Sequence, residues 1–305
     1  MDIIDGRYIG NGDKNLFVKI LGQGNIPVVI ETGWGSLSFE WEAIQKELAK
    51  NTTVITYDRA GYAESPSSSF PRASAQVAGE LYTMLKTSGV PGPYILVGHN
   101  GGGLYMQHFA KMFANEVAGM VLVDSISQFD DKFDKLDAPK YQEIMSHQTK
   151  TKNFRQYAEM EKKEFEKMII PMLGTIFENY PDNIKETMIT YQSDQDFYKT
   201  ILNEMETRDE SLELINQQSI FTNIPVKILC RDFKVMIDFA CQLGVPEDEA
   251  RAVEELWLQN SKDLLNLSTD SKFEIVKNAG HNIHIDNPAV VVKSILDVMK
   301  KASIE

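Results

Sequence analysis

The sequence predicts an α/β protein built on a mostly parallel sheet that helices cover on both faces. Short apolar runs alternate with segments of helical periodicity through residue 125, and the alternation resumes near residue 223. A parallel sheet covered on both faces needs near-continuous apolar strands, and the runs 94–97 and 120–123 are of this kind. A stretch without convincing strands, 126–222, separates the two parts.

The first part of the chain supplies alternating strands and helices. Apolar and β-branched runs predict strands over 16–21, 28–30, 53–57, 94–97 and 120–123. Apolar residues three or four positions apart predict helices over 39–50, about 73–88 and 104–113. In the first of these helices, Trp41, Ile44 and Leu48 fall on one face, as a helix packed on a sheet requires.

The block 126–222 is helical and rich in Met and charge. Beyond it the alternation returns, with strands over 225–230 and 273–276, a helix around 247–267 and a last helix from about Pro288. We therefore expect a core made of residues 1–125 and 223–305. Residues 126–222 are expected to be inserted on one side of the sheet as a helical cap, or lid.

A glycine-rich turn, Gly98-His99-Asn100-Gly101-Gly102, directly follows an apolar strand and opens a helix. A strand, a G-x-nucleophile-x-G run and a helix form the sharp turn that exposes an attacking side chain above a sheet. The glycines are needed because strand and helix pack closely there. The central residue takes a positive φ, which Asn tolerates better than most residues. The turn therefore predicts a catalytic centre at Asn100.

The stretch 26–127 resembles the α/β-hydrolase superfamily, close to its small esterase- and lipase-like members. Besides the turn at Asn100, the matching pieces are Glu31–Ser36, Tyr57–Ser65, Pro93–His99, and Ala279–His281 followed by Asp286-Asn287-Pro288. With the inserted helices as the family's cap, the resemblance covers nearly the whole chain. It implies the α/β-hydrolase fold.

The resemblance also implies which residues form the site. Such a site combines a nucleophile, a histidine base and a carboxylate that orients the base. The family's catalytic-histidine loop corresponds to the segment that ends in His281, which we expect to be the base. The oxyanion hole is expected to use the backbone N–H groups of Gly101 and Trp34.

Two carboxylates compete for the role of the orienting acid. The family usually carries this acid after the seventh strand, where Asp232 stands, although the usual Gly-x-x-Asp pattern is missing. Some relatives carry it at the end of the sixth strand, where Asp124 stands. We rank Asp124 slightly above Asp232 and keep Asp232 as the alternative.

The other histidines and the inserted apolar residues carry weaker expectations. His284 is expected to support the structure or line the pocket, His99 to point away from the site, and His108 and His147 to be ordinary surface or packing residues. The apolar residues of the insertion could line a pocket above Asn100 that suits an acyl or alkyl group, but a Met-rich helix more often packs in a core than lines a ligand site. These residues are Met145, Met160, Phe165, Met168, Ile169, Met172, Leu173, Ile176 and Phe177.

Asn100 stands where the attacking side chain belongs, and a neutral carboxamide is a poor nucleophile. Loss of the attacking group costs on the order of 10⁶ in kcat. The sequence therefore predicts a carboxylic-ester hydrolase whose activity in this form is low or absent. Two alternatives stay open. One is a non-hydrolytic protein that binds a ligand or partner. The other is an aspartate-nucleophile enzyme, like dehalogenases and epoxide hydrolases, formed by deamidation of the Asn100-Gly101 pair.

The composition restricts partners and compartment. A formal net charge of −13 argues against nucleic acid and anionic membranes as partners. The N-terminal residues lack a signal-peptide pattern, and no stretch approaches the roughly 20 apolar residues of a membrane span. With Cys230 and Cys241 alone, neither a disulfide framework nor a Cys/His metal spacing is predicted. We expect a cytoplasmic monomer or homodimer that binds a small molecule and uses no metal or cofactor.

Overall fold

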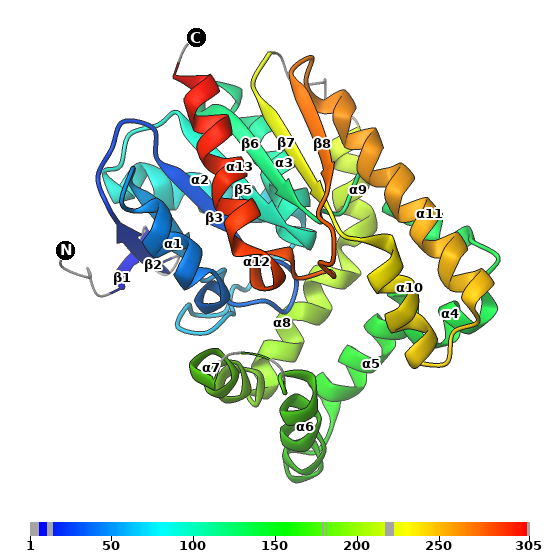
Figure 1. The fold of residues 1–305 in the computed structure, drawn as a ribbon. Helices are drawn as coiled ribbons and strands as arrows, with labels where there is room; N and C mark the ends of the chain where they lie inside the picture. The colour runs from blue at the N-terminus through cyan, green and yellow to red at the C-terminus, as the bar shows by residue number, and fades with distance from the viewer. Residues whose placement is uncertain (1–5, 11–14, 179, 181, 217–222, 304–305) are drawn as a thin grey trace.

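The computed structural model describes residues 6–10, 15–178, 180, 182–216 and 223–303 around an eight-stranded sheet (Figure 1). The strands are β1 (Arg7–Ile9), β2 (Leu16–Leu21), β3 (Val28–Glu31), β4 (Val54–Tyr57), β5 (Tyr94–His99), β6 (Val117–Val123), β7 (Val226–Cys230) and β8 (Ser271–Ile275). Their order across the sheet is β1-β2-β4-β3-β5-β6-β7-β8. β2 runs antiparallel to both of its neighbours, and the other pairs are parallel. The predicted α/β architecture with a mostly parallel sheet is confirmed.

Helices cover both faces of the sheet, as Figure 1 shows with α13 on the near side and α2 and α3 behind. The helices of this part are α1 (Glu42–Leu48), α2 (Ser74–Ser88), α3 (Asn100–Met112), α10 (Phe233–Gln242), α11 (Glu247–Asp263), α12 (Ile283–Asp286) and α13 (Pro288–Ala302). Because successive strand residues point to opposite faces, β5 contributes to two apolar layers. Ile95 and Val97 pack with α1 and α13, whereas Tyr94 and Leu96 pack with α2 and α3.

Three elements of this part, β1, α10 and the four-residue helix α12, were not predicted from the sequence. β1 has only three residues, two of them exposed, so its sequence carries little of the apolar signal of a strand. α10 begins directly after Asp232, whose side chain accepts a hydrogen bond from the backbone N–H of Lys234 and so caps the helix. A further difference is the start of α3, which begins at Asn100 itself and not at Leu104.

Between β6 and β7 the described residues form helices and no strand. These inserted helices are α4 (Pro139–Met145), α5 (His147–Glu159), α6 (Lys162–Ile176), α7 (Asp182–Gln192), α8 (Gln195–Glu206) and α9 (Arg208–Asn216). α5, α6 and α7 lie beyond one end of the sheet, and α8 runs back from them towards it (Figure 1). In the described part of the chain, no helix is long and apolar enough to cross a membrane.

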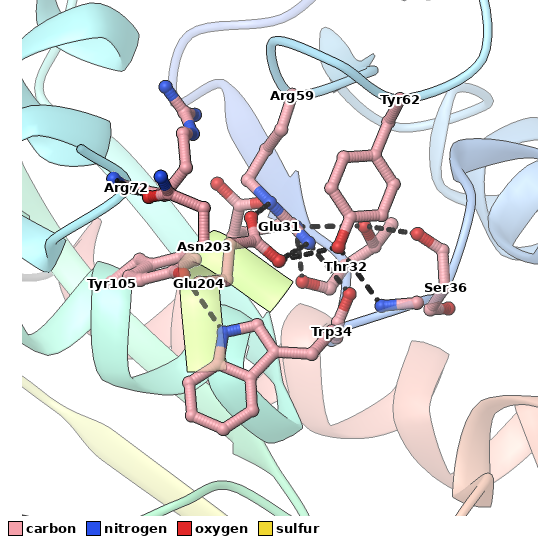
Figure 2. A network of polar contacts seen from close by, with 12 residues as sticks. Glu31, Thr32, Trp34, Ser36, Arg59, Tyr62, Arg72, Tyr105, Asn203 and Glu204 are labelled. Atoms are coloured by element: carbon pink, nitrogen blue, oxygen red, sulfur yellow. Dashed lines mark hydrogen bonds and ion pairs between the residues drawn. The ribbon is translucent and has the colours of Figure 1, made fainter. Parts of the chain in front are cut away.

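A buried arginine joins the inserted helices to the sheet (Figure 2). Arg59 follows β4 and donates to Glu31 Oε1 at the end of β3 (2.6 Å) and to Glu204 Oε1 on α8 (2.8 Å). The three side chains are at most 1% exposed. Tyr62 adds a second link, since its hydroxyl donates to Glu204 (2.5 Å). The guanidinium of Arg59 therefore binds two buried carboxylates, that of Glu31 in the sheet and that of Glu204 on the inserted helix α8.

Replacing this arginine should destabilise the protein strongly. Arg59→Met leaves Glu31 and Glu204 buried without their cation, and losing one member of such a pair costs about 3–5 kcal/mol. Urea unfolding followed by circular dichroism measures the effect. The matched control is Arg155→Met, which removes an exposed pair with Glu206 between α5 and α8 and should cost about 0–1 kcal/mol. Equal losses in the two variants would contradict the assignment of Arg59 as the main polar link.

Candidate active site

The turn between β5 and α3 leaves no room for side chains at Gly98 and Gly102, two residues before and after Asn100. A Cβ on Gly102 would lie 2.3 Å from the carbonyl oxygen of Thr32, and one on Gly98 would lie 2.6 Å from the Cα of Gly103. Asn100 itself has a φ of +49°, in the left-handed region. This crowding restricts the backbone conformation between the strand and the helix. The Asn100 side chain lines a cavity.

The loop after β3 packs directly against this turn. The backbone N–H of Trp34 donates a long hydrogen bond to Oδ1 of Asn100 (3.4 Å). The indole of Trp34 donates to the hydroxyl of Tyr105 on α3 (2.8 Å), a contact that Figure 2 shows. A Cβ on Gly101 would lie 2.4 Å from that indole. The N–H groups in the first turn of a helix have no partner within the helix, and that of Gly101, directly after Asn100, is one of them.

Asp124 and His281 meet below the cavity although 157 positions separate them. The Nδ1 of His281 lies 2.7 Å from Oδ2 of Asp124, and we assign the proton of this bond to the histidine. Asp124 follows β6 in a positive-φ conformation (+42°) and is 1% exposed. Its Oδ1 accepts from the indole of Trp257 (2.9 Å) and from the backbone N–H of Arg231 (3.2 Å). Both oxygens of the Asp124 carboxylate therefore have hydrogen-bond partners.

The charge of Arg231 keeps Asp124 ionised. Burial alone raises the pKa of Asp124, but Arg231 and the hydrogen bond from His281 outweigh it, and the pKa is lowered overall. Arg231 also forms two bonds to Glu254 on α11 (2.5 and 2.9 Å) and lies 3.9 Å from the ring centroid of Trp257. The roles of Arg231, Trp257 and Glu254 were not predicted from the sequence. Their only signal was that Arg231 directly follows a buried strand.

Asp232 has a different set of contacts from Asp124. One of its carboxylate oxygens accepts from the backbone N–H of Lys234 (3.1 Å) and the other from that of Asn278 (3.0 Å). These bonds cap α10 and fix the turn after β8. The structure therefore brings Asp124, and not the alternative Asp232, into hydrogen-bonding contact with His281.

A layer of aromatic rings supports His281 from below. His99 lies with its ring centroid 4.7 Å from that of His281, and its Nε2 donates to the carbonyl of His281 (3.1 Å). Burial, reinforced by the charges of His284 and His281, lowers the pKa of His99 well below its usual value, so its ring is neutral. His284 stacks on Trp41 at 4.4 Å. His99 and His284 are buried beneath the site and support it.

A cavity of about 490 Å³ opens beside Asn100 and His281. Its apolar lining includes Trp34, Ile126, Phe133, Met145, Phe154, Ile201, Met205, Met236, Phe239, Val253 and Trp257. Of the nine residues predicted to line it, Met145 alone does so. Phe165, Ile169, Leu173 and Phe177 belong instead to a separate apolar cluster, which also contains Met188 of α7 and Phe197 and Tyr198 of α8. For these residues the structure therefore shows the packing alternative and not the pocket lining.

One further sequence expectation concerns the cavity. His147 was expected to be a surface or packing residue, but it lines the cavity, with its ring centroid 6.3 Å from that of Trp34.

Among the residues that the structure describes, no group of three or more His, Cys, Asp or Glu side chains is arranged to hold a metal ion. Cys230 is buried at the end of β7 and Cys241 is exposed on α10.

Comparison with known proteins finds a family that this chain matches. A family model described as "alpha/beta hydrolase fold" matches residues 26–223. The uncharacterized protein YqjL of Bacillus subtilis is 26% identical over 277 residues, which cover 91% of this chain and 85% of YqjL. Among solved structures, an esterase from Thermogutta terrifontis has a TM-score of 0.66 at 20% identity and covers 97% of this chain and 98% of its own. The epoxide hydrolase CorEH gives 0.69 at 15%, with the same coverage. At these identities the two structures show a shared fold alone.

The burial of His147 makes stability depend on pH. Burial, followed by the charge of Arg208, lowers its pKa to about 4 from a usual 6.5. The unfolded chain therefore takes up this proton near pH 6.5 and the folded protein only near pH 4, so the free energy of unfolding falls as pH falls between these values. His147→Gln should remove up to roughly 1.4 kcal/mol per pH unit from this dependence. Urea titrations at pH 7, 6 and 5 measure the free energy of unfolding of the native protein and of the variant. If this free energy depends on pH equally in both, His147 is not the source of the dependence.

Proposed function

The chain belongs to the α/β-hydrolase family, and we propose that its site is that of a carboxylic-ester hydrolase in which Asn100 replaces the attacking side chain. Turnover in this form is then low or absent. The observation that carries the proposal is the 2.7 Å contact between His281 and Asp124, set beside a fully formed nucleophile turn. A histidine base needs an orienting carboxylate of this kind, which is buried, compensated by a positive charge and hydrogen-bonded to the ring.

Each residue has a role in this proposal. His281 uses Nδ1 for the bond to Asp124, which leaves Nε2 to take a proton from an attacking hydroxyl at position 100. An ester carbonyl beside that position finds the N–H groups of Trp34 and Gly101, which stabilise negative charge on its oxygen. The apolar wall of the cavity suits the acyl or alkyl part of the ester. Asn100 supplies no hydroxyl or carboxylate, so no acyl-enzyme can form.

The domain assignment is part of the same proposal. Residues 1–125 and 223–305 contain the glycine-rich turn at Asn100, called the elbow from here on, together with the base and the acid. Residues 126–222 act as a cap. Support comes from the cavity, whose lining combines Asn100 and His281 of the core with residues of α4, α5 and α8. The buried bridge of Arg59 to Glu204 holds such a cap in place over the elbow.

One observation favours a second candidate, a protein that binds a ligand without reaction. Oδ1 of Asn100 accepts the N–H of Trp34, one of the two donors that an oxyanion would use. A ligand carbonyl must compete with the protein's own carboxamide for this donor. In such a protein Asn100 is a polar recognition group, whose amide N–H faces the cavity as a donor.

Deamidation of Asn100 to aspartate is the third possibility, and the structure gives it little support. The reaction requires the backbone nitrogen of Gly101 to attack the side-chain carbon of Asn100. Gly101 lies in the first turn of α3 and packs on the indole of Trp34, so the approach requires the helix start to unwind. Peptide mapping of the purified protein should therefore find Asn100 unmodified.

Restoring a hydroxyl at the elbow tests the proposal. Asn100→Ser should hydrolyse short p-nitrophenyl esters several orders of magnitude faster than the native chain, because His281 then has a proton to accept. Stopped-flow release of p-nitrophenolate measures kcat and shows a burst if the acyl-enzyme accumulates. The control is the double variant Asn100→Ser, His281→Ala, which should return to the background rate. If Asn100→Ser folds but hydrolyses no ester, the hydrolase proposal fails and the binding role stands.

The choice of acid is tested in the same Asn100→Ser background. Asp124→Asn should lower kcat by on the order of 10³–10⁴, since the amide cannot hold His281 in the required tautomer. Asp232→Asn keeps an oxygen that can cap α10, so its kcat should stay within a few-fold of the parent. Loss of activity in the Asp232 variant, with retention in the Asp124 variant, would reverse the assignment.

A further inference from the structure

The loop after β3, residues 32–36, is bonded to an inserted helix directly beside Trp34. The N–H of Gly35 donates to the hydroxyl of Tyr62 (3.1 Å), and its carbonyl accepts from Nε2 of Gln192 (2.8 Å). Gln192 is the last residue of α7 and is 8% exposed. Both backbone polar groups of Gly35 therefore have side-chain partners, and one of these partners belongs to the inserted helices.

The hydroxyl of Tyr62 links the same loop to a second inserted helix. Besides accepting the N–H of Gly35, it donates to Oε2 of Glu204 on α8 (2.5 Å), and Figure 2 shows this hydroxyl turned towards the carboxylate. Burial, followed by the charge of Glu204, raises the pKa of Tyr62, so its hydroxyl keeps the proton that it donates. A continuous path of hydrogen bonds therefore joins Gly35 to α8.

Arg59 joins the other side of this loop to the same glutamate. Its Nη1 donates to the carbonyl of Thr32 (2.7 Å), and its Nη2 donates to the carbonyl of Gly33 (2.8 Å). Its Nε donates to Oε1 of Glu204 (2.8 Å). The orientation of the guanidinium, and with it the backbone that precedes Trp34, therefore depends on Glu204.

The turn that contains Tyr62 packs on α8 without space for a side chain between them. A Cβ on Gly61 would lie 2.2 Å from Oγ1 of Thr200 on α8. Gly61 has a φ of +86°, in the region that glycine adopts most readily. The position of Tyr62 is therefore coupled to that of α8 by close packing as well as by the bond to Glu204.

These contacts surround the N–H of Trp34, which lies between the bonded residues Gly33 and Gly35. This N–H already lies 3.4 Å from Oδ1 of Asn100. A donor that stabilises negative charge during a reaction acts only if it is held in place in advance. A displacement of about 1 Å at such a site can cost on the order of 10²-fold in rate. The residues that fix this loop therefore affect any chemistry at the elbow.

We propose that Gln192 and Glu204 of the inserted helices are positioning residues for the N–H of Trp34. Gln192 acts through the carbonyl of Gly35, and Glu204 acts through Tyr62 and Arg59. The use of this N–H on an oxyanion rests on the proposed hydrolase function, whereas the fixation of the loop rests on the contacts alone. The inserted helices then complete the site in addition to lining its cavity.

Amide hydrogen exchange in the native background tests the fixation of the loop without any need for catalysis. Gln192→Met replaces the amide donor by an apolar side chain of similar length, and Tyr62→Phe removes one hydroxyl. In both variants the exchange rate of residues 33–36 should rise at least about ten-fold, because a buried backbone group loses its partner. Peptide-level mass spectrometry measures the rates, and those of β5 and β6 should stay unchanged.

Two matched controls remove the same groups elsewhere. Gln195→Met deletes an amide that donates to the carbonyls of Tyr157 and Met160 within the inserted helices (2.9 and 2.7 Å). Tyr94→Phe deletes a buried hydroxyl that donates to the carbonyl of Val90 (2.8 Å). Neither change should alter the exchange of residues 33–36. Circular dichroism and Tm verify that each variant folds.

Kinetics in the Asn100→Ser background test whether the fixation matters for the reaction. Gln192→Met and Tyr62→Phe should each lower kcat about ten- to hundred-fold, because the misplaced donor stabilises the transition state less well. KM should change by less than about three-fold, since a donor that acts on the transition state contributes little to substrate binding. The two control substitutions should leave kcat within a few-fold of the parent. A loss of folded protein alone would not produce this separation of kcat from KM in samples of equal active-site content.

The proposal is overturned if the exchange of residues 33–36 is unchanged in both variants, or if it rises equally over the whole chain. It is also overturned if an active Asn100→Ser protein keeps its kcat when either substitution is added. A folded but inactive Asn100→Ser protein rejects the hydrolase function instead. In that case, faster exchange confined to residues 33–36 still supports the fixation of the loop by the inserted helices, and unchanged exchange removes both proposals.

Discussion

The lack of space at the end of β5 is the constraint on which the rest of the site depends. Three chain segments meet there: the loop after β3, the turn itself and the first turn of α3. Side chains at Gly98 or Gly102 would collide with backbone atoms that cannot move away. The chain therefore crosses this point in one conformation, with Asn100 at positive φ and its side chain in the cavity. The site geometry follows from backbone crowding, whatever residue stands at position 100.

Two buried polar clusters hold the chain segments around this turn in position. On one side, Arg59 joins Glu31 to Glu204 and fixes α8 above the loop that contains Trp34. On the other, Asp124 links His281 to Arg231. In both clusters a guanidinium compensates a carboxylate that burial alone would neutralise. Burying these charges is unfavourable in itself, so each cluster fixes positions around the elbow more than it adds to stability.

Much of this architecture could be predicted from the sequence, because apolar strands and the glycine turn are local signals. The runs at β5 and β6 identify a buried parallel sheet, and the elbow identifies where its site lies. The lining of the cavity could not be predicted in the same way. Phe165 and Ile169 have the apolar spacing of a pocket wall, but whether they line a pocket or pack in a core depends on how α6 lies among the other inserted helices. Arg231 was not identified for a related reason, since its importance comes from residues that are distant in the sequence, Asp124 and Glu254.

We propose that this site contains every part that acyl transfer needs except the attacking atom. The most direct measurement is covalent labelling with diisopropyl fluorophosphate, which reacts with a hydroxyl only when a histidine base and an oxyanion hole activate it. Intact-mass analysis of Asn100→Ser should show a single adduct, mapped to position 100, and the native chain should show none. A folded Asn100→Ser variant that stays unlabelled, or a native chain that is labelled elsewhere in the cavity, would contradict the account.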